Sequence, residues 1–180
     1  ANGLLVMMKE IGIERDATTY NSLLKWHAND EAKVDNLYAQ MIEDGVKPDV
    51  YTYNTMIQSF SKDTAKVDQL YTLMIDEGVK PDVYTYSTMI RAYSGDLATV
   101  DKLYQRMIEE EIKPNVYIYS LMIDVFAKSE MLEKAIAKFE SMTKERILPN
   151  EVTYTTRIDA YAKSGKSERA IELFDWMKKE

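Results

Sequence analysis

A short unit repeats along the whole chain. The segment 50–82, VYTYNTMIQSFSKDTAKVDQLYTLMIDEGVKPD, returns almost intact as 83–115, VYTYSTMIRAYSGDLATVDKLYQRMIEEEIKPN. Weaker copies extend this pattern, so that complete units span 17–49, 50–82, 83–115 and 116–150, with partial units at 1–16 and 151–180. The first three complete units have 33 residues and the fourth has 35. Repetition at this period predicts a single solenoid domain over residues 1–180, because such units bury their apolar faces only against their neighbours.

Each unit carries two amphipathic segments. In the first segment, apolar residues follow the i, i+3, i+4, i+7 spacing of a helix that is buried on one face, as in Tyr53, Met56, Ile57 and Phe60. The second segment ends at a glycine or at a proline shortly afterwards, both of which stop helices. We therefore predict an all-α fold of helix-turn-helix repeats. The two additional residues of the fourth unit lie near 129–130, where we expect them to lengthen a turn and leave both helices intact.

The composition excludes several kinds of chemistry. The chain has no cysteine and one histidine, His27, which rules out disulfides, thiolate metal sites and a cysteine nucleophile. His27 stands where the next unit has Phe60, so we interpret it as a core residue. The carboxylates lie mainly on the second segments beside basic residues, as on a solvated face. We expect no enzymatic activity, no cofactor, no metal, no small-molecule substrate and no membrane-spanning helix.

The chain resembles the pentatricopeptide repeat family in residues that recur in every unit. These are Val-x-Thr-Tyr-Asn-Thr-x-Ile at the start, Met-x-x-x-Gly-x-x-Pro-Asp at the end, and Ala135-x-x-x-Phe139 between them. Tetratricopeptide repeats fit less well, because their early glycine is missing here. The resemblance implies a right-handed superhelical solenoid that binds single-stranded RNA, one base per repeat. It also implies a location in mitochondria or chloroplasts. The usual unit of the family has 35 residues, so the units of 33 residues are a departure.

The resemblance assigns base selection to the fifth and last places of each unit. The selecting pairs are then Asn21 with Asp49, Asn54 with Asp82, Ser87 with Asn115 and Ser120 with Asn150, while Thr155 has no partner in the chain. In the family, Asn with Asp favours uracil and Ser with Asn favours adenine, which predicts the core 5′-UUAA-3′. The second place packs against the base and is held by Thr18, Tyr51, Tyr84, Tyr117 and Val152. An alternative is that the polar residues only start or cap helices, and that the tyrosines pack between repeats.

Charge distribution bears on the choice of partner. The net charge of −7 argues against nucleic acid. However, the expected first helices (18–29, 51–62, 84–95, 117–128 and 152–163) carry six basic and two acidic residues, a net of +4, which leaves −11 on the rest. Phosphate contacts are expected at one shared place near the end of the first helix, which holds Lys62, Lys128 and Lys163. The acidic convex face is a candidate surface for a protein partner. The alternative function is a tetratricopeptide-like scaffold that binds a basic peptide or partner protein.

Overall fold

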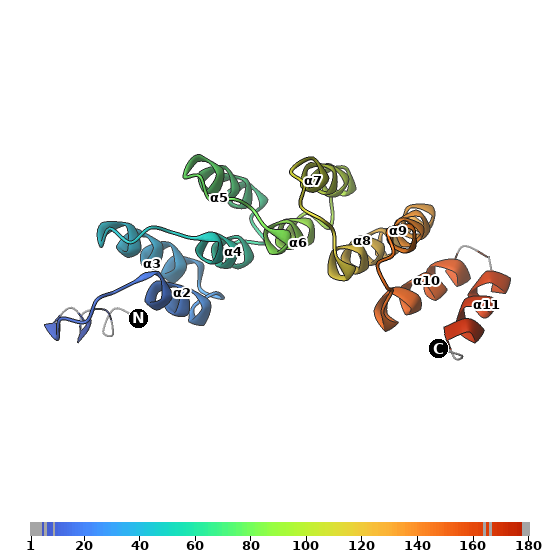
Figure 1. The fold of residues 1–180 in the computed structure, drawn as a ribbon, viewed down its shortest axis with the longest axis horizontal. Helices are drawn as coiled ribbons and strands as arrows, with labels where there is room; N and C mark the ends of the chain where they lie inside the picture. The colour runs from blue at the N-terminus through green and yellow to red at the C-terminus, as the bar shows by residue number, and fades with distance from the viewer. Residues whose placement is uncertain (1–4, 6, 9, 164, 166, 178–180) are drawn as a thin grey trace. The chain divides into compact units, whose positions relative to one another are not determined.

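A computed structural model describes Leu5, Met7, Met8, residues 10–163, Gly165 and residues 167–177. These residues form helices in pairs and contain no strand, as predicted (Figure 1). The first helices of the pairs are α2 (Ala17–Trp26), α4 (Val50–Ser59), α6 (Val83–Ala92), α8 (Val116–Lys128) and α10 (Glu151–Lys163). The second helices are α3 (Glu31–Glu43), α5 (Thr64–Asp76), α7 (Leu97–Glu109), α9 (Leu132–Lys144) and α11 (Ser167–Met177). Much of the predicted partial unit 1–16 lies outside the described residues.

Acidic or amide side chains begin most of these helices. Asp49 caps α4 by accepting a hydrogen bond from the Thr52 N–H at 2.8 Å. Asp96 does the same for α7, and its hydrogen bonds to the Thr99 hydroxyl and N–H lower the pKa of this carboxyl. Such caps satisfy backbone donors that have no partner inside the helix. Each cap therefore fixes where a loop ends and a new helix starts.

Left-handed residues follow the second helices α3, α5, α7 and α9. Gly45 follows α3 with φ of 72°, and the Val46 N–H donates to the Met41 carbonyl at 3.0 Å, as in a Schellman motif. Gly78 follows α5 in the same conformation. After α7 and α9 the corresponding residues are Glu111 and Arg146, with φ of 59° and 60°. The turn therefore keeps its geometry where the glycine is absent, at a steric cost to the side-chain-bearing residue.

The helices group into two compact units, residues 1–92 and 93–180. In the first unit, α2 packs against α4 and α4 against α6, so the first helices form a layer, and α3 and α5 pack against it. In the second unit, α8 packs against α10, with α9 and α11 beside them. The core of each unit follows the predicted stripe, since Tyr53, Ile57 and Phe126 are fully or almost fully buried. His27 is only half-buried at the end of α2, so its interpretation as a core residue was wrong.

Pairs of tyrosines connect successive repeats inside each unit. The hydroxyls of Tyr71 and Tyr86 lie 3.1 Å apart, and those of Tyr104 and Tyr119 lie 3.0 Å apart. Burial raises the pKa of Tyr119, and hydrogen bonds to Tyr104 and Glu145 raise it further. Each pair joins a second helix to the first helix of the next repeat. Burying both hydroxyls is tolerated because each one is the other's hydrogen-bond partner.

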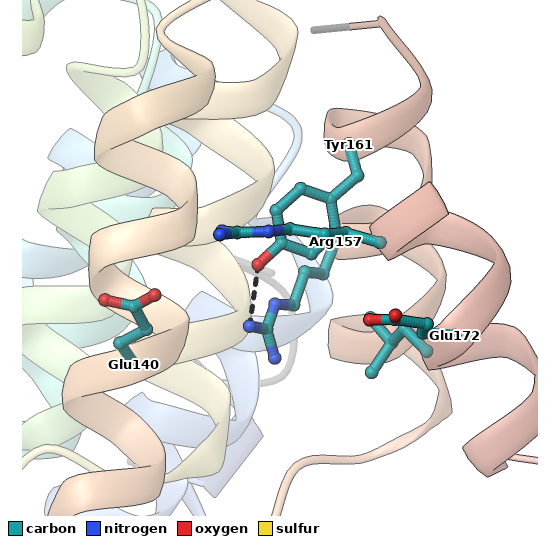
Figure 2. A pocket seen from close by; sticks show the side chains of 6 residues that line it. Glu140, Arg157, Tyr161 and Glu172 are labelled. Atoms are coloured by element: carbon teal, nitrogen blue, oxygen red, sulfur yellow. Dashed lines mark hydrogen bonds between the residues drawn. The ribbon is translucent and has the colours of Figure 1, made fainter. Parts of the chain in front are cut away.

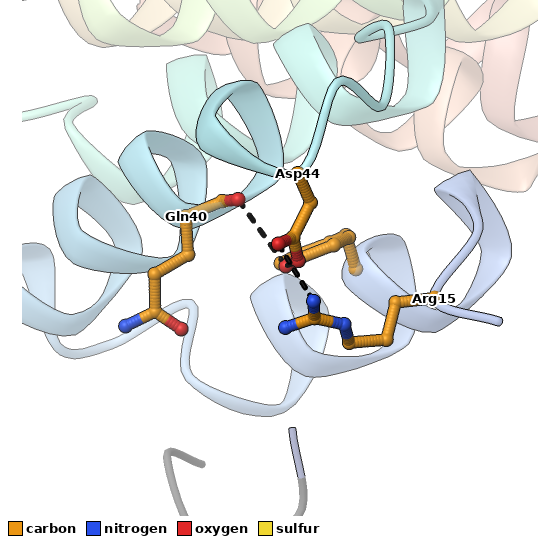
Figure 3. A network of polar contacts seen from close by, with 4 residues as sticks. Arg15, Gln40 and Asp44 are labelled. Atoms are coloured by element: carbon orange, nitrogen blue, oxygen red, sulfur yellow. Dashed lines mark hydrogen bonds and ion pairs between the residues drawn. The ribbon is translucent and has the colours of Figure 1, made fainter. Parts of the chain in front are cut away.

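Tyr20 has Leu5 where Tyr53 has its partner Tyr38, and its hydroxyl joins a charged network around Asp44 instead (Figure 3). The Tyr20 hydroxyl donates to Asp44, and the Arg15 guanidinium pairs with the same carboxylate at 2.7 Å. The Tyr20 oxygen also lies 3.3 Å from the Gln40 carbonyl. Burial, followed by the hydrogen bond to Asp44, raises the pKa of Tyr20 to about 12.

The two additional residues of the fourth unit lengthen a helix. Whereas α4 and α6 have 10 residues, α8 has 13 and continues to Lys128. The expectation of a longer turn was therefore wrong. In the shorter units an aspartate such as Asp63 caps the second helix and ends the connection early. In the fourth unit, α8 instead ends on Glu130 in the left-handed conformation, and Met131 begins α9 without a side-chain cap.

Candidate nucleic-acid interface

A pocket of about 410 Å³ lies on the first helices of the first unit. Two partly exposed tyrosines line it, Tyr51 at the start of α4 (43% exposed) and Tyr84 at the start of α6 (49% exposed). The same pocket is lined by the predicted selecting pair, Asn54 and Asp82. The remaining lining residues are Lys25, Ala28, Val50, Thr55 and Gln58. Two aromatic side chains and an amide–carboxylate pair therefore share one concave site.

Asn54 and Asp82 are in direct contact. The Asn54 Nδ2 donates to Asp82 Oδ1 at 3.1 Å, and Asn54 Oδ1 accepts from the Thr85 hydroxyl at 2.6 Å. Asn54 is 6% exposed and Thr85 is fully buried. The structure thus brings the second predicted pair together and adds a third residue, Thr85, that sequence reasoning missed.

The first predicted pair repeats this arrangement. Asn21 Nδ2 lies 3.1 Å from both carboxylate oxygens of Asp49, and Asn21 Oδ1 accepts from the Thr52 hydroxyl at 2.7 Å. Thr52 and Thr85 occupy the third place of their units. Their signal in the sequence was the Thr-Tyr that recurs at the third and fourth places, and a threonine there is equally typical of a helix start.

The predicted serine selectors bond to their own helices. Ser87 donates to the Tyr84 carbonyl at 2.9 Å, and Ser120 donates to the Val116 carbonyl at 2.7 Å. Thr155 likewise donates to the Glu151 carbonyl at 2.8 Å. Asn150, the predicted partner of Ser120, accepts a hydrogen bond from the Thr153 N–H, as a helix cap would. Within the described part of the second unit, no hydrogen bond joins Ser120 to Asn150. Ser120 therefore bonds to its own helix and not to the last place of its unit.

The second places all project into solvent at the start of a first helix. Tyr117 is 44% and Val152 57% exposed, and Thr18 is also exposed. The Tyr84 hydroxyl donates to Gln58 Oε1 at 2.9 Å, which ties the Tyr84 ring to the preceding repeat. Gln58 and Lys25 hold the ninth place of their units and were missed as pocket residues. Their spacing gives the signal, because the fifth and ninth places lie on one face of a helix.

The lysines predicted to contact phosphate occupy different settings. Lys62 lies in the turn that follows α4, whereas Lys128 and Lys163 end α8 and α10. Lys128 pairs with Asp124 at 2.8 Å, and Lys163 pairs with Asp159 at 2.7 Å. Exposed pairs of this kind contribute only about 0–1 kcal/mol, so a phosphate would compete with them at modest cost. For Lys62 we find no ion pair among the described residues. Because α4 is shorter than α8, the same place of the unit falls in the turn at Lys62 and at the helix end at Lys128.

A second cavity, of about 340 Å³, lies among α9, α10 and α11 (Figure 2). Arg157 stands where other first helices have a methionine such as Met56. Its guanidinium lies 4.0 Å from the centre of the Phe139 ring and donates to the Tyr161 hydroxyl at 2.8 Å. Two arginines and two glutamates line this cavity: Arg157, Arg169, Glu140 and Glu172. This mixture of charges favours neither an anion nor a cation.

In the described ranges, no three His, Asp or Glu side chains gather closely enough to hold a metal ion. None of the helices described combines the length and the apolar character needed to cross a membrane.

Comparison with protein families identifies matches along most of the chain. A PPR repeat family model matches residues 27–62, 114–163 and 149–180. A pentatricopeptide repeat domain model matches residues 69–129, and a PPR repeat model matches residues 51–79. Among curated proteins, no significant relative was found.

Solved structures of similar fold include PPR10 from maize, with a TM-score of 0.70 and 26% identity over 98% of this chain and 26% of that one. PPR10 in complex with an 18-nt psaJ RNA element gives a TM-score of 0.78 at 20% identity, over 96% and 26% of the two chains. The PPR domain of Arabidopsis thaliana protein-only RNase P 1, in complex with tRNA, gives 0.74 at 16% identity, over 91% and 89%. The present chain therefore spans about a quarter of the length of PPR10.

Proposed function

The chain belongs to the pentatricopeptide repeat family, and from this premise we propose that it binds single-stranded RNA sequence-specifically, one base per repeat, with 5′-UUAA-3′ as the core target. The observation that carries the proposal is the pocket in which Tyr51 and Tyr84 lie together with Asn54 and Asp82. Its volume falls within the roughly 300–1,000 Å³ typical of ligand sites. The RNA complexes of PPR10 and of the RNase P domain add support from similar folds.

Each part of the pocket has a separate task in this proposal. The tyrosine rings stack on the base, which is worth about 1–3 kcal/mol per base and does not depend on base identity. Asn54 and Asp82 supply the donor and acceptor that distinguish one base edge from another. Lys25, which also lines the pocket, supplies positive charge for the backbone. Stacking therefore provides affinity, and the polar pair provides selection.

We propose that the chain acts as a binding module without catalysing a reaction. The pocket residues show no pair of a nucleophile and a base. The polar side chains beside Asn54 and Asp82 are Lys25, Gln58, Thr55 and the two tyrosines, and the Thr55 hydroxyl donates to the Tyr51 carbonyl at 2.9 Å. The family favours action in mitochondria or chloroplasts. The net charge of −7 makes the expected binding weak and strongly salt-dependent.

Binding to fluorescently labelled single-stranded RNA tests this proposal. We expect tighter binding to an RNA that contains UUAA than to one that contains GGCC, at both low and moderate salt. Tyr84→Ala should weaken binding about 5- to 100-fold, the loss expected for one stacked base. Trp26→Ala is the matched control, because Trp26 is 83% exposed and does not line the pocket.

Two outcomes would contradict the proposal. Equal binding to both RNAs would show a non-specific RNA solenoid. Binding of a basic peptide, with no binding to either RNA, would favour the protein scaffold instead. In that case the acidic surface, rather than the tyrosine-lined pocket, would be the functional site.

A further inference from the structure

We propose that Thr52 and Thr85 are specificity-determining positioning residues, which hold the selecting asparagine amide of the preceding repeat in one orientation. The inference rests on the proposed function and assigns a role to a place that the base-selecting pairs do not include. Both threonines are fully buried and lie between an asparagine and an aspartate. The same arrangement occurs in two successive repeats.

The orientation of the amide follows from donor and acceptor chemistry. A carboxylate only accepts hydrogen bonds, so the Asn54 atom 3.1 Å from Asp82 Oδ1 is the donor Nδ2. Asn54 Oδ1 then faces Thr85, whose hydroxyl donates to it across 2.6 Å and also lies 3.0 Å from Asp82 Oδ1. The Thr85 oxygen in turn accepts from the Asp82 N–H at 3.1 Å. Finally, the Thr85 N–H donates to Asp82 Oδ1 at 2.8 Å, which closes a ring of hydrogen bonds.

This ring leaves a defined pattern for the base. Among the described residues, no hydrogen bond uses the second Nδ2 hydrogen of Asn54 or the Oδ2 of Asp82, and both residues line the pocket. One donor and one acceptor are therefore offered in a fixed order. Uracil presents O4 as an acceptor beside the N3–H donor, whereas cytosine presents the reverse order, an N4 donor beside the N3 acceptor. A flipped amide would offer the other group, and two contacts oppose the flip: Asp82 accepts from Nδ2, and the Thr85 hydroxyl donates to Oδ1. The threonine hydroxyl therefore acts together with Asp82 in separating the two pyrimidines.

In the other repeats, the third place offers no hydroxyl hydrogen to the selecting side chain. The unit that follows Ser87 has Ile118 at its third place, which carries no hydroxyl. Ser120 is followed by Thr153, whose hydroxyl donates to the Asn150 backbone carbonyl at 2.7 Å instead of to a selecting side chain. A serine has no amide to orient. The third-place threonine therefore donates to the selecting side chain in the two repeats where that side chain is an asparagine, whose amide has an oxygen end and a nitrogen end.

Replacing the hydroxyl tests the inference. Thr85→Val keeps the shape of the side chain and removes its hydrogen bonds, Thr85→Ser keeps the hydroxyl, and Thr88→Val is the matched control. Thr88 is also buried, and its hydroxyl donates to the Tyr84 carbonyl at 2.9 Å. The readout is the ratio of affinities for RNAs that contain UUAA and UCAA. We expect Thr85→Val to lower this ratio about tenfold, while the other two variants stay within about twofold of the wild type.

A second measurement needs neither RNA nor a variant. In the free wild-type protein, the Asn54 side-chain amide protons should exchange with solvent at least about tenfold more slowly than those of the exposed Asn29. Equal exchange rates would overturn the inference, even if Thr85→Val failed to fold. So would a Thr85→Val protein that bound both RNAs more weakly by the same factor. If the wild type did not prefer UUAA over UCAA, the proposed function would fail at this base, and the exchange rates would still show whether the Asn54 amide is held in hydrogen bonds.

Discussion

At the scale of single residues, the left-handed turn after the second helices keeps its backbone geometry even where the repeat lacks its usual glycine. The second helices end on a left-handed residue, which is glycine at Gly45 and Gly78 but Glu111 after α7. Because a side chain in this conformation is strained, we predict that Glu111→Gly stabilises the protein by roughly 0.5–1 kcal/mol. Gly78→Ala, which introduces the same strain, should destabilise it by a similar amount. Urea denaturation measures both, and a destabilised Glu111→Gly protein would contradict the assignment.

The buried tyrosines predict how stability depends on pH. The pKa of Tyr20 is about 12 in the folded protein, whereas an unfolded tyrosine titrates near pH 10. The unfolded chain therefore releases this proton first, so the contribution of Tyr20 is complete below pH 10 and is lost between about pH 10 and 12. We predict that the melting temperature of the wild type falls more steeply over this range than that of Tyr20→Phe. Parallel slopes for the two proteins would contradict it.

The sequence predicted some of the residues that line the candidate site and missed others. Repetition and the family resemblance placed Asn54, Asp82 and the two pocket tyrosines, because these types recur at fixed places. Thr85 and Gln58 were missed, since their contacts cross from one repeat to the next. A single-repeat pattern contains no information about which side chains meet across that boundary.

At the scale of elements, the apolar period predicted the helices but not their exact lengths. The fourth unit has two more residues than the third, and the structure uses them to extend α8. The determining feature is the cap: Asp63 starts α5 early, whereas the start of α9 has no capping side chain. Caps are single residues that periodicity does not weigh, which is why the helix boundary was predicted wrongly.

Two substitutions test this account of the caps. Asp63→Ala removes the acceptor for the Lys66 N–H and should lower the free energy of unfolding by about 0.5–2 kcal/mol. Met131→Asp introduces the missing cap at the start of α9 and should raise it by about 0.5–1 kcal/mol. Urea denaturation monitored by circular dichroism measures both effects. A neutral Asp63→Ala would show that this cap does not determine the start of α5.

At the scale of the whole molecule, the central question is how an acidic chain would hold RNA. Two of the lysines expected to contact phosphate are paired with aspartates, whereas Lys25 lines the pocket itself. We predict that Lys25→Met reduces the slope of log affinity against log salt by about 0.7, the value for one phosphate contact on a single strand. Lys128→Met should change this slope less, because Lys128 is already paired with Asp124, which the substitution leaves without its ion-pair partner. The affinity of each variant for UUAA RNA, measured at several salt concentrations, gives these slopes. Identical slopes for the wild type and Lys25→Met would show that Lys25 does not contact the RNA backbone.

The measurement that tests base-by-base reading most directly is an exchange of one selecting pair. The double variant Asn54→Ser, Asp82→Asn gives the second repeat the serine–asparagine pair found in the third and fourth. Affinities of the wild type and the variant are then compared on RNAs that contain UUAA and UAAA. The account predicts that the preference moves from UUAA to UAAA, with the best affinity of each protein similar. A variant that still preferred UUAA, or that lost affinity equally for both RNAs, would contradict it.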